Sequence, residues 1–343
     1  MTPRIGDEGD DGVAHASIFP CTDFLRDAGI LDDFLFLVNK VGLMEFMQDE
    51  SEQYARLTKI FVGSFTFNNT HFSPSVAFKI YDKPYTMDLK RFCRVVGIAP
   101  SGTTRRIQGQ PPELLELYRE VTYDDDRTAQ RGKIRNIQLP AIRYFTYYLA
   151  TSVLARENTS NISNYHLAFL AAALKDNKTY NLGALIARRR AAKGPIFGGI
   201  IAARILAYLG LSVDLNDELL TPQRLELAAM KGHHFITPNS HAGCLVYKVL
   251  FTDGSEKELP LPQPSLFSIF RKPLSLSKEE LDEHLGALNF HSQHYPEQQQ
   301  PTYEAPPEDY TVYYTGASWS SHQDEGPSSS YTGGAPVWPT WDD

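Results

Sequence analysis

The sequence predicts a mainly α-helical fold: a multi-helix bundle with one or two short β-hairpins, between a disordered acidic N-terminal arm and a disordered C-terminal tail. Apolar residues recur at helical spacing through most of the chain, and the period changes to alternation only around residues 75–87 and 244–262. Hydrophobic residues make up 42% of the 343 residues and aromatic residues 12%, which is enough for a sizeable buried core.

Composition divides the chain into three parts. Residues 1–16 are acidic and glycine-rich with little apolar content, so we expect a disordered arm. Residues 17–290 form the predicted helical core, with a possible sub-boundary near 101–135. Residues 291–343 are acidic and rich in Pro, Tyr and Ser without a period, which predicts a disordered tail.

The first part of the core predicts short helices and one hairpin. Thr22 or Asp23 can start a helix that breaks near Gly29, and a second helix is expected from residue 50 to 62. Residues 75–87 alternate apolar and polar around Asp82-Lys83-Pro84, as in a β-hairpin. A helix then begins at residue 86 or 88 and stops at Gly97.

The second part predicts the helical bundle. A Gly-, Ser- and Arg-rich loop at 101–112 leads to a modest helix at 112–121. Pro140 suits the first turn of a helix that runs to Arg156, and Ser163 caps the next one. Further helices are expected at 180–192, 198–209, 219–231 and 277–288, with a hairpin at 244–262 whose turn is Asp253-Gly254.

The distribution of charge suggests where a polyanion would bind. The net charge is -8, but residues 101–210 hold 16 Lys or Arg against 8 Asp or Glu, whereas residues 276–343 hold one Lys against 12 acids. The candidate nucleic-acid-binding residues flank the bundle helices: Arg131, Lys133, Arg135, Arg188, Arg189, Arg190 and Lys193.

Two alternative roles of these basic residues stay open. Cations at a helix C-terminus are favoured by the helix dipole alone, and a basic run can also direct nuclear import. Among the aromatic residues of the 140–156 helix, Tyr144 and Tyr147 are the ones expected to be free for base stacking.

No catalytic residues, metal ligands or cofactor site are predicted. His233, His234, His241 and Cys244 lie close in sequence, but the chain has no C-x2-C pair to make a zinc knuckle. Residues 124–126 are three aspartates, which are more typical of a solvated loop than of a magnesium site. The glycines around 194–199 lack the lysine of a phosphate-binding loop. We therefore expect no enzyme activity and no small-molecule substrate.

The expected location is intracellular, cytoplasmic or nuclear. Three scattered cysteines do not form a disulfide framework, and the acidic N-terminus is unlike a signal peptide. The longest apolar run, residues 194–211, contains Arg204, so a buried helix is favoured over a membrane span and no membrane partner is expected.

Three stretches resemble the ORF-1 protein, or gag region, of plant Athila-type retrotransposons. They are FKIYDKPYTMDLKRFCRVVGI (78–98), RGKIRNIQLPAIRYFTYYLATSVLARENTSNISNYHLAFLAAAL (131–174) and GPIFGGIIAARILAYLGL (194–211). The resemblance implies a structural protein that associates with itself or with RNA, and it carries no catalytic residues. The alternative hypothesis is a non-enzymatic host interaction module related to plant mobile-domain proteins.

Overall fold

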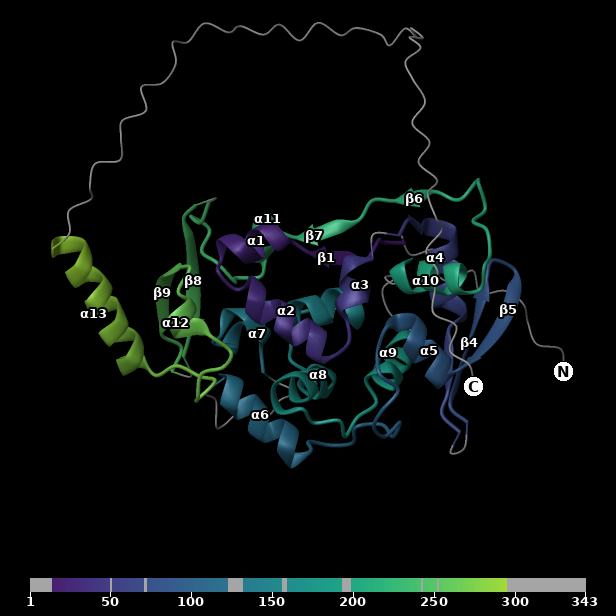
Figure 1. Ribbon diagram of the computed structural model, residues 1–343, viewed down its shortest axis with the longest axis horizontal. Helices are drawn as coiled ribbons and strands as arrows, with labels where there is room; N and C mark the ends of the chain where they lie inside the picture. The colour runs from purple at the N-terminus through teal and green to yellow at the C-terminus, as the bar shows by residue number, and fades with distance from the viewer. Residues whose placement is uncertain are drawn as a thin grey trace, which may run out of the picture. The chain divides into compact units, whose positions relative to one another are not determined.

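Figure 1 shows the computed structural model of the chain. The residues that it describes are 14–49, 51–70, 73–122, 132–155, 159–192, 199–241, 243–251 and 253–294. The chain divides after Gln293, and the fold described below belongs to the part before that point. The predicted tail lies outside the described residues from 295 onward, and the predicted arm from 1 to 13.

The start of the ordered chain lies slightly earlier than predicted. Ala14 and Ala16, which were assigned to the disordered arm, are buried. The adjacent backbone explains their order, because the N–H of Ser17 donates to Oε1 of Gln53 at 2.8 Å and ties this segment to the core. At the other end, the last helix continues to His294, four residues beyond the predicted end of the core.

Helices predominate in the described residues. α2 packs against both α7 and α8, and α6 packs against α8, so these four helices make up the centre of the core. The α-helices are α1 (Thr22–Asp27), α2 (Leu31–Lys40), α3 (Met44–Gln48), α4 (Ala55–Ser64), α5 (Leu89–Val96), α6 (Pro112–Thr122), α7 (Pro140–Tyr148), α8 (Asn164–Lys175), α9 (Leu182–Ala191), α10 (Gly199–Tyr208), α11 (Leu227–Gly232), α12 (Pro264–Phe267) and α13 (Lys278–His294).

The structure contains more β-sheet than the one or two predicted hairpins, because the described residues form four small sheets. Two of these are the pairs β1–β7 and β2–β6, the third is β3–β4–β5, and the fourth is β8–β9. The strands are β1 (Ile18–Pro20), β2 (Gln53–Tyr54), β3 (Thr66–Asn68), β4 (Ser75–Ile80), β5 (Lys83–Asp88), β6 (Leu219–Leu220), β7 (Gln223–Leu225), β8 (Leu245–Leu250) and β9 (Glu256–Leu261).

Local signals in the first third of the core are confirmed. The break between α1 and α2 lies at Gly29, whose φ of 66° favours glycine. The hairpin β4–β5 forms as predicted, and the side chain of Asp88 then caps α5 by accepting from the N–H of Arg91 at 2.8 Å. Gly97 ends α5 in the left-handed conformation. The helix expected at 50–62 begins later, at Ala55, because Gln53 and Tyr54 pair with β6.

The bundle helices are also confirmed, although the helix predicted to run to Arg156 ends at Val153. Pro140 occupies the first turn of α7, which continues through one turn of π-helix, η2 (Leu149–Val153). Ser163 caps α8 in a capping box with His166. Asn181 caps α9, since its Oδ1 accepts from the N–H of Ala184 at 2.8 Å.

The prediction of a helix at 219–231 is wrong for the first half of that range. Residues 219–225 form β6 and β7 instead, and only Leu227–Gly232 is helical, as α11. β7 runs parallel to β1, and β6 runs antiparallel to β2. These strands exist because distant N-terminal segments offer them backbone partners, a tertiary effect that outweighs local propensity.

The second hairpin follows the prediction, and the last helix forms but continues past its predicted end at residue 288 to His294. β8 and β9 pair over six residues each, and the turn contains Asp253-Gly254, of which only Gly254 has a positive φ, at 83°. α13 lies beside this hairpin in Figure 1 and is joined to it by ion pairs of Lys257 with Asp282 and of Lys278 with Asp253.

A buried arginine joins α7 to the β8–β9 hairpin. The side chain of Arg143 is 1% exposed and donates to the carbonyl of Lys248 in β8 at 2.8 Å and to that of His234 at 2.6 Å. Its guanidinium lies over the rings of Phe235 and Tyr247, with its central carbon 5.6 and 5.3 Å from their centroids. One side chain therefore donates to two backbone carbonyls from separate segments of the chain.

We expect Arg143→Met to lower the free energy of unfolding by about 2–4 kcal/mol, because two partly buried carbonyls lose a charged donor at once. Urea denaturation followed by far-UV circular dichroism measures the change. Arg119→Met is the matched control on the exposed face of α6 and should stay within about 0.5 kcal/mol of wild type. Equal effects of the two substitutions would contradict the role assigned to Arg143.

Candidate nucleic-acid interface

The structure separates the predicted basic residues into different environments. Arg131 and Lys193 lie outside the described residues. Lys133 is partly buried, and its Nζ donates to Oδ1 of Asn161 at 2.5 Å. Arg135 is exposed on the short 3-10 helix η1 (Ile134–Asn136), where its charge helps to lower the pKa of the Glu256 carboxyl, after the larger effect of Lys248.

The consecutive arginines Arg188, Arg189 and Arg190 occupy the last turn of α9 and point in different directions. The helix is well anchored upstream of them, since Gly183 packs so closely on Cys93 that an added Cβ would lie 2.3 Å from its Sγ. The residues from Leu182 to Ala187 are buried, so only the last turn of the helix brings charged side chains toward the surface.

Arg190 is not available to a phosphate. It is 5% exposed, and its Nη2 donates to the carbonyl of Ser152 at 2.9 Å and lies 3.3 Å from that of Val153. These carbonyls belong to the π-helical turn η2, whose geometry leaves them to be satisfied from outside. Burial lowers the pKa of Arg190, and the charge of Arg189 adds to this. The expectation that this residue binds nucleic acid is therefore wrong, because its guanidinium is a structural donor.

Arg188 and Arg189 are half-buried and remain near the surface. Arg188 donates to the carbonyl of Thr104 at 2.5 Å, and its guanidinium lies 5.1 Å from the centre of the Phe67 ring in β3. Arg189 donates to the carbonyl of Ala155 at 3.3 Å. Each guanidinium has five N–H donors, so one carbonyl bond leaves most of them for another acceptor.

The contact with Thr104 brings two further arginines to this place. Arg105 and Arg106 are exposed in the loop that was predicted only as a connector. The loop is fixed to the start of α9, because the N–H of Thr103 donates to the carbonyl of Thr179 at 2.8 Å and its carbonyl accepts from Asn181 at 3.0 Å.

We call Arg105, Arg106 and Arg188 the arginine cluster. Burial lowers the pKa of Arg188, Tyr165 raises it, and the positive charge of Arg106 lowers it further. Within the described residues, no carboxylate forms an ion pair with any member of the cluster. The adjacent Arg-Arg pair was visible in the sequence, but its position against α9 depends on tertiary contacts.

The aromatic residues expected to stack on bases are buried. Tyr144 is fully buried, and its hydroxyl donates to the carbonyl of Leu225 at 2.8 Å and accepts from the N–H of Cys21 at 3.0 Å. Tyr147 is 2% exposed and donates to the carbonyl of His233 at 2.9 Å. The expectation of base stacking by Tyr144 and Tyr147 is wrong, because each hydroxyl satisfies a buried backbone group.

Of the residues weighed as metal ligands, His233 contributes to packing, whereas His234, His241 and Cys244 are exposed. His233 stacks on Tyr147 with ring centroids 4.6 Å apart, and burial lowers the pKa of His233. Within the described part of the chain, no three His, Cys, Asp or Glu side chains come close enough together to hold a metal ion. The aspartates at 124–126 lie outside the described residues.

Arg204, the charged residue of the longest apolar run, is neutralised within the fold. Its guanidinium pairs with Glu45 at 3.2 Å and with Asp49 at 3.4 Å. These two ion pairs connect α10 to α3 and to the residue that follows it. Among the helices of the described residues, none is both long and apolar enough to span a membrane.

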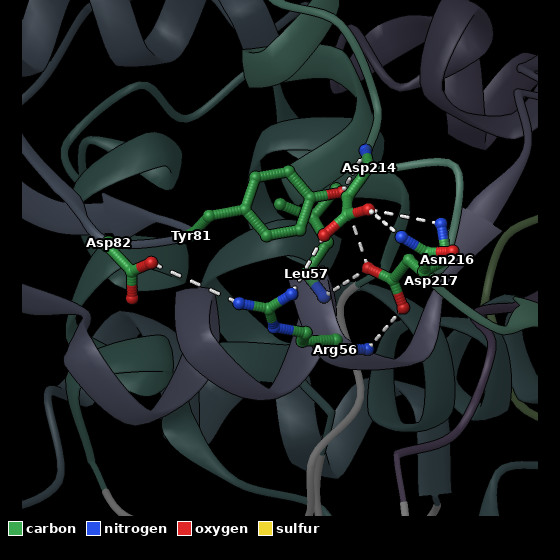
Figure 2. Close-up of polar contacts among 7 residues, drawn as sticks. All are labelled: Arg56, Leu57, Tyr81, Asp82, Asp214, Asn216 and Asp217. Atoms are coloured by element: carbon green, nitrogen blue, oxygen red, sulfur yellow. Dashed lines mark hydrogen bonds and ion pairs between the residues drawn. The ribbon is translucent and has the colours of Figure 1, made fainter.

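Several carboxylates do gather around the start of α4, as Figure 2 shows. Both oxygens of Asp217 accept backbone N–H groups, from Arg56 at 2.7 Å and from Leu57 at 2.8 Å, which caps α4 from 160 residues away. The guanidinium of Arg56 pairs with Asp214 at 2.8 Å and reaches Asp82 at 4.0 Å. The carboxylates here fix a helix end and a loop, and their lone pairs are directed at these partners rather than at a common reaction centre.

We expect Asp217→Ala to destabilise the protein by about 1–2 kcal/mol, because α4 loses both N-terminal hydrogen bonds at once. Thermal unfolding followed by circular dichroism measures the loss. Asp82→Ala is the control, since this carboxylate is 93% exposed and its ion pair with Arg56 is long, at 4.0 Å. A control variant as unstable as Asp217→Ala would show that charge, rather than capping, matters at this site.

Comparison with protein families identifies the chain. Residues 14–183 match the model of the ATHILA ORF-1 family, which is 170 of the 343 residues. No curated protein and no solved structure matches the chain significantly. The match includes Arg105 and Arg106 and ends just after α9 begins, so the third resembling stretch, 194–211, lies beyond it. Through residues 14–183 the chain belongs to the ATHILA ORF-1 family and is a retrotransposon-derived protein of the Athila type.

Proposed function

We propose that the protein is a non-enzymatic, gag-like structural protein that associates with copies of itself and binds RNA without sequence preference. The observation that carries the RNA-binding part is the arginine cluster, three guanidinium groups that no carboxylate of the described residues neutralises. Unpaired arginines on a surface are ready-made phosphate contacts, and their affinity for a polyanion does not depend on base sequence.

The composition of the cluster supports contact with phosphates rather than with bases. Arg188 is held in place by Thr104 and Phe67, so it is pre-organised, whereas Arg105 and Arg106 are exposed beside it. The aromatic platform expected from Tyr144 and Tyr147 does not accompany them, because both rings are buried. The fitting ligand is thus a flexible single-stranded RNA that can adapt its backbone to the arginines. We place this activity in the cytoplasm or nucleus.

The double variant Arg105→Gln/Arg106→Gln should weaken RNA binding and reduce its dependence on salt. Each phosphate contact contributes about 0.7 to the slope of log affinity against log salt for a single strand, so losing two lowers the slope by about 1.4. Fluorescence anisotropy with a labelled, unstructured RNA, measured between about 50 and 200 mM KCl, gives both quantities.

The matched control is Lys40→Gln/Arg119→Gln, which removes the same charge from exposed positions on α2 and α6. Equal losses for the two double variants would mean that net charge, not the cluster, governs binding. No binding by wild type at low salt would overturn the RNA-binding proposal. A stable protein partner retained without RNA would then favour the host interaction module related to plant mobile-domain proteins.

A further inference from the structure

α5 presents a second basic surface, on the side of the helix that faces away from the core. Its three cations, Lys90, Arg91 and Arg94, are exposed. Successive residues of an α-helix are about 100° apart, so these side chains fall within one arc of about 100°. The apolar residues of the helix lie on the opposite side and are buried: Leu89, Phe92, Val95 and Val96. We call Lys90, Arg91 and Arg94 the α5 basic face.

No carboxylate of the described residues forms an ion pair with the α5 basic face. The carboxylate of Asp88 accepts the backbone N–H of Arg91 at 2.8 Å and caps the helix. Glu45, which lies beside Gly97 at the other end of α5, pairs with Arg204 instead. The three positive charges are therefore left to solvent or to a ligand.

The stability of α5 does not explain these charges. Lys90 and Arg91 lie in the first turn of the helix, where the helix dipole disfavours cations. Lys90 and Arg94 are four residues apart, and like charges at that spacing repel each other. Only Arg94, in the last turn, is favoured by the dipole. Two of the three cations thus lie where they destabilise the helix, so folding does not account for them.

An aromatic ring accompanies the face. The guanidinium of Arg91 lies 5.6 Å from the centre of the Tyr208 ring, which is 48% exposed at the end of α10. α10 packs against α5, so the two helices hold the arginine and the ring together. Exposed arginines beside an accessible aromatic ring are typical of surfaces that bind single-stranded nucleic acid.

The chemistry of the face favours RNA over an anionic membrane. Helices that lie on a membrane insert an apolar face beside their cations. The apolar residues of α5 are buried in the core and cannot insert. Cations without such an apolar face suit a polyanion whose phosphates stay in water.

The α5 basic face lies on a helix in direct contact with the one that carries Arg188 of the arginine cluster. Figure 1 shows α5 and α9 side by side, and Gly183 of α9 packs against Cys93 of α5. Arg188 follows Gly183 by five residues, about 7.5 Å along the helix axis. Both basic surfaces therefore belong to one pair of packed helices, within reach of a single flexible strand.

We propose that the α5 basic face is a second phosphate-binding site and that one RNA strand contacts it together with the arginine cluster. This inference rests on the RNA binding proposed above and extends its footprint. Each surface alone offers few cations and binds weakly, whereas a strand that engages both gains from the high effective concentration of the second contact. The protein therefore prefers long single strands over short ones.

The double variant Lys90→Gln/Arg94→Gln tests the proposal and leaves Arg91 in place on Tyr208. With a labelled, unstructured RNA of about 20 nucleotides, it should bind at least about tenfold more weakly than wild type at low salt. The slope of log affinity against log salt should fall by about 1.4, as the loss of two phosphate contacts on a single strand predicts. Combination with the double variant of the arginine cluster should lower the slope by about 2.8.

The length of the RNA distinguishes one shared strand from two independent sites. A strand of about 5 nucleotides occupies one surface at a time, so removal of either surface should reduce affinity only about twofold. Fluorescence anisotropy with both lengths gives the comparison. A loss of about tenfold at both lengths would overturn the shared strand, because the short RNA would then depend on a single surface.

Two controls isolate the contact. Lys90→Arg/Arg94→Lys keeps both charges and should bind like wild type, and Lys40→Gln/Arg119→Gln removes two charges from α2 and α6. Circular dichroism confirms that each variant is folded. If Lys90→Gln/Arg94→Gln loses no more affinity than Lys40→Gln/Arg119→Gln, the α5 site is overturned and the arginine cluster stands.

Two further outcomes contradict the proposal in different ways. Absence of RNA binding by wild type at low salt overturns RNA binding as a whole, and with it both surfaces. A Lys90→Gln/Arg94→Gln variant that keeps its RNA affinity but no longer binds vesicles containing phosphatidylserine assigns the α5 basic face to a membrane instead.

Discussion

The fold is organised around the guanidinium of Arg143, because it is the charged group on which three separate parts of the chain converge. α7 supplies the side chain, the turn after α11 and the strand β8 supply the carbonyls, and two aromatic rings complete its surroundings. A buried cation is costly unless its donors are used, so its presence fixes where the β8–β9 hairpin lies against the helices. The hairpin in turn positions α13 through the ion pairs of Lys257 and Lys278.

Arginines serve different purposes within a short distance on α9 and its neighbours. Arg190 stabilises the end of a π-helical turn, Arg188 contacts a loop and the strand β3 and still lies near the surface, and Arg105 and Arg106 are exposed. The difference follows from helix geometry, since consecutive residues are about 100° apart around the axis and cannot share one environment. A run of arginines is therefore better regarded as several sites than as one patch.

Local structure was predictable from the sequence wherever a single residue determined the backbone. Gly29, Asp88, Gly97, Pro140 and Ser163 all lie at the helix ends expected of them. What could not be predicted depends on partners far along the chain: strands at 219–225 need β1 and β2, and Asp217 caps a helix 160 residues earlier. The candidate nucleic-acid interface could not be predicted for the same reason. Nothing in the sequence shows that Arg105 and Arg106 lie against α9 or that Tyr144 and Tyr147 point inward.

The pairing of β1 with β7 links residues more than 200 positions apart, from Ile18 to Gln223. During synthesis, β1 and β2 leave the ribosome long before β6 and β7 exist, so their backbone hydrogen bonds stay unmade until most of the core has been translated. The segment that matches the family model ends at residue 183, and a chain cut there would leave β1 and β2 as unpaired edges. The folding unit of this protein therefore extends beyond the family match, because residues after 183 supply the partner strands that complete the native core.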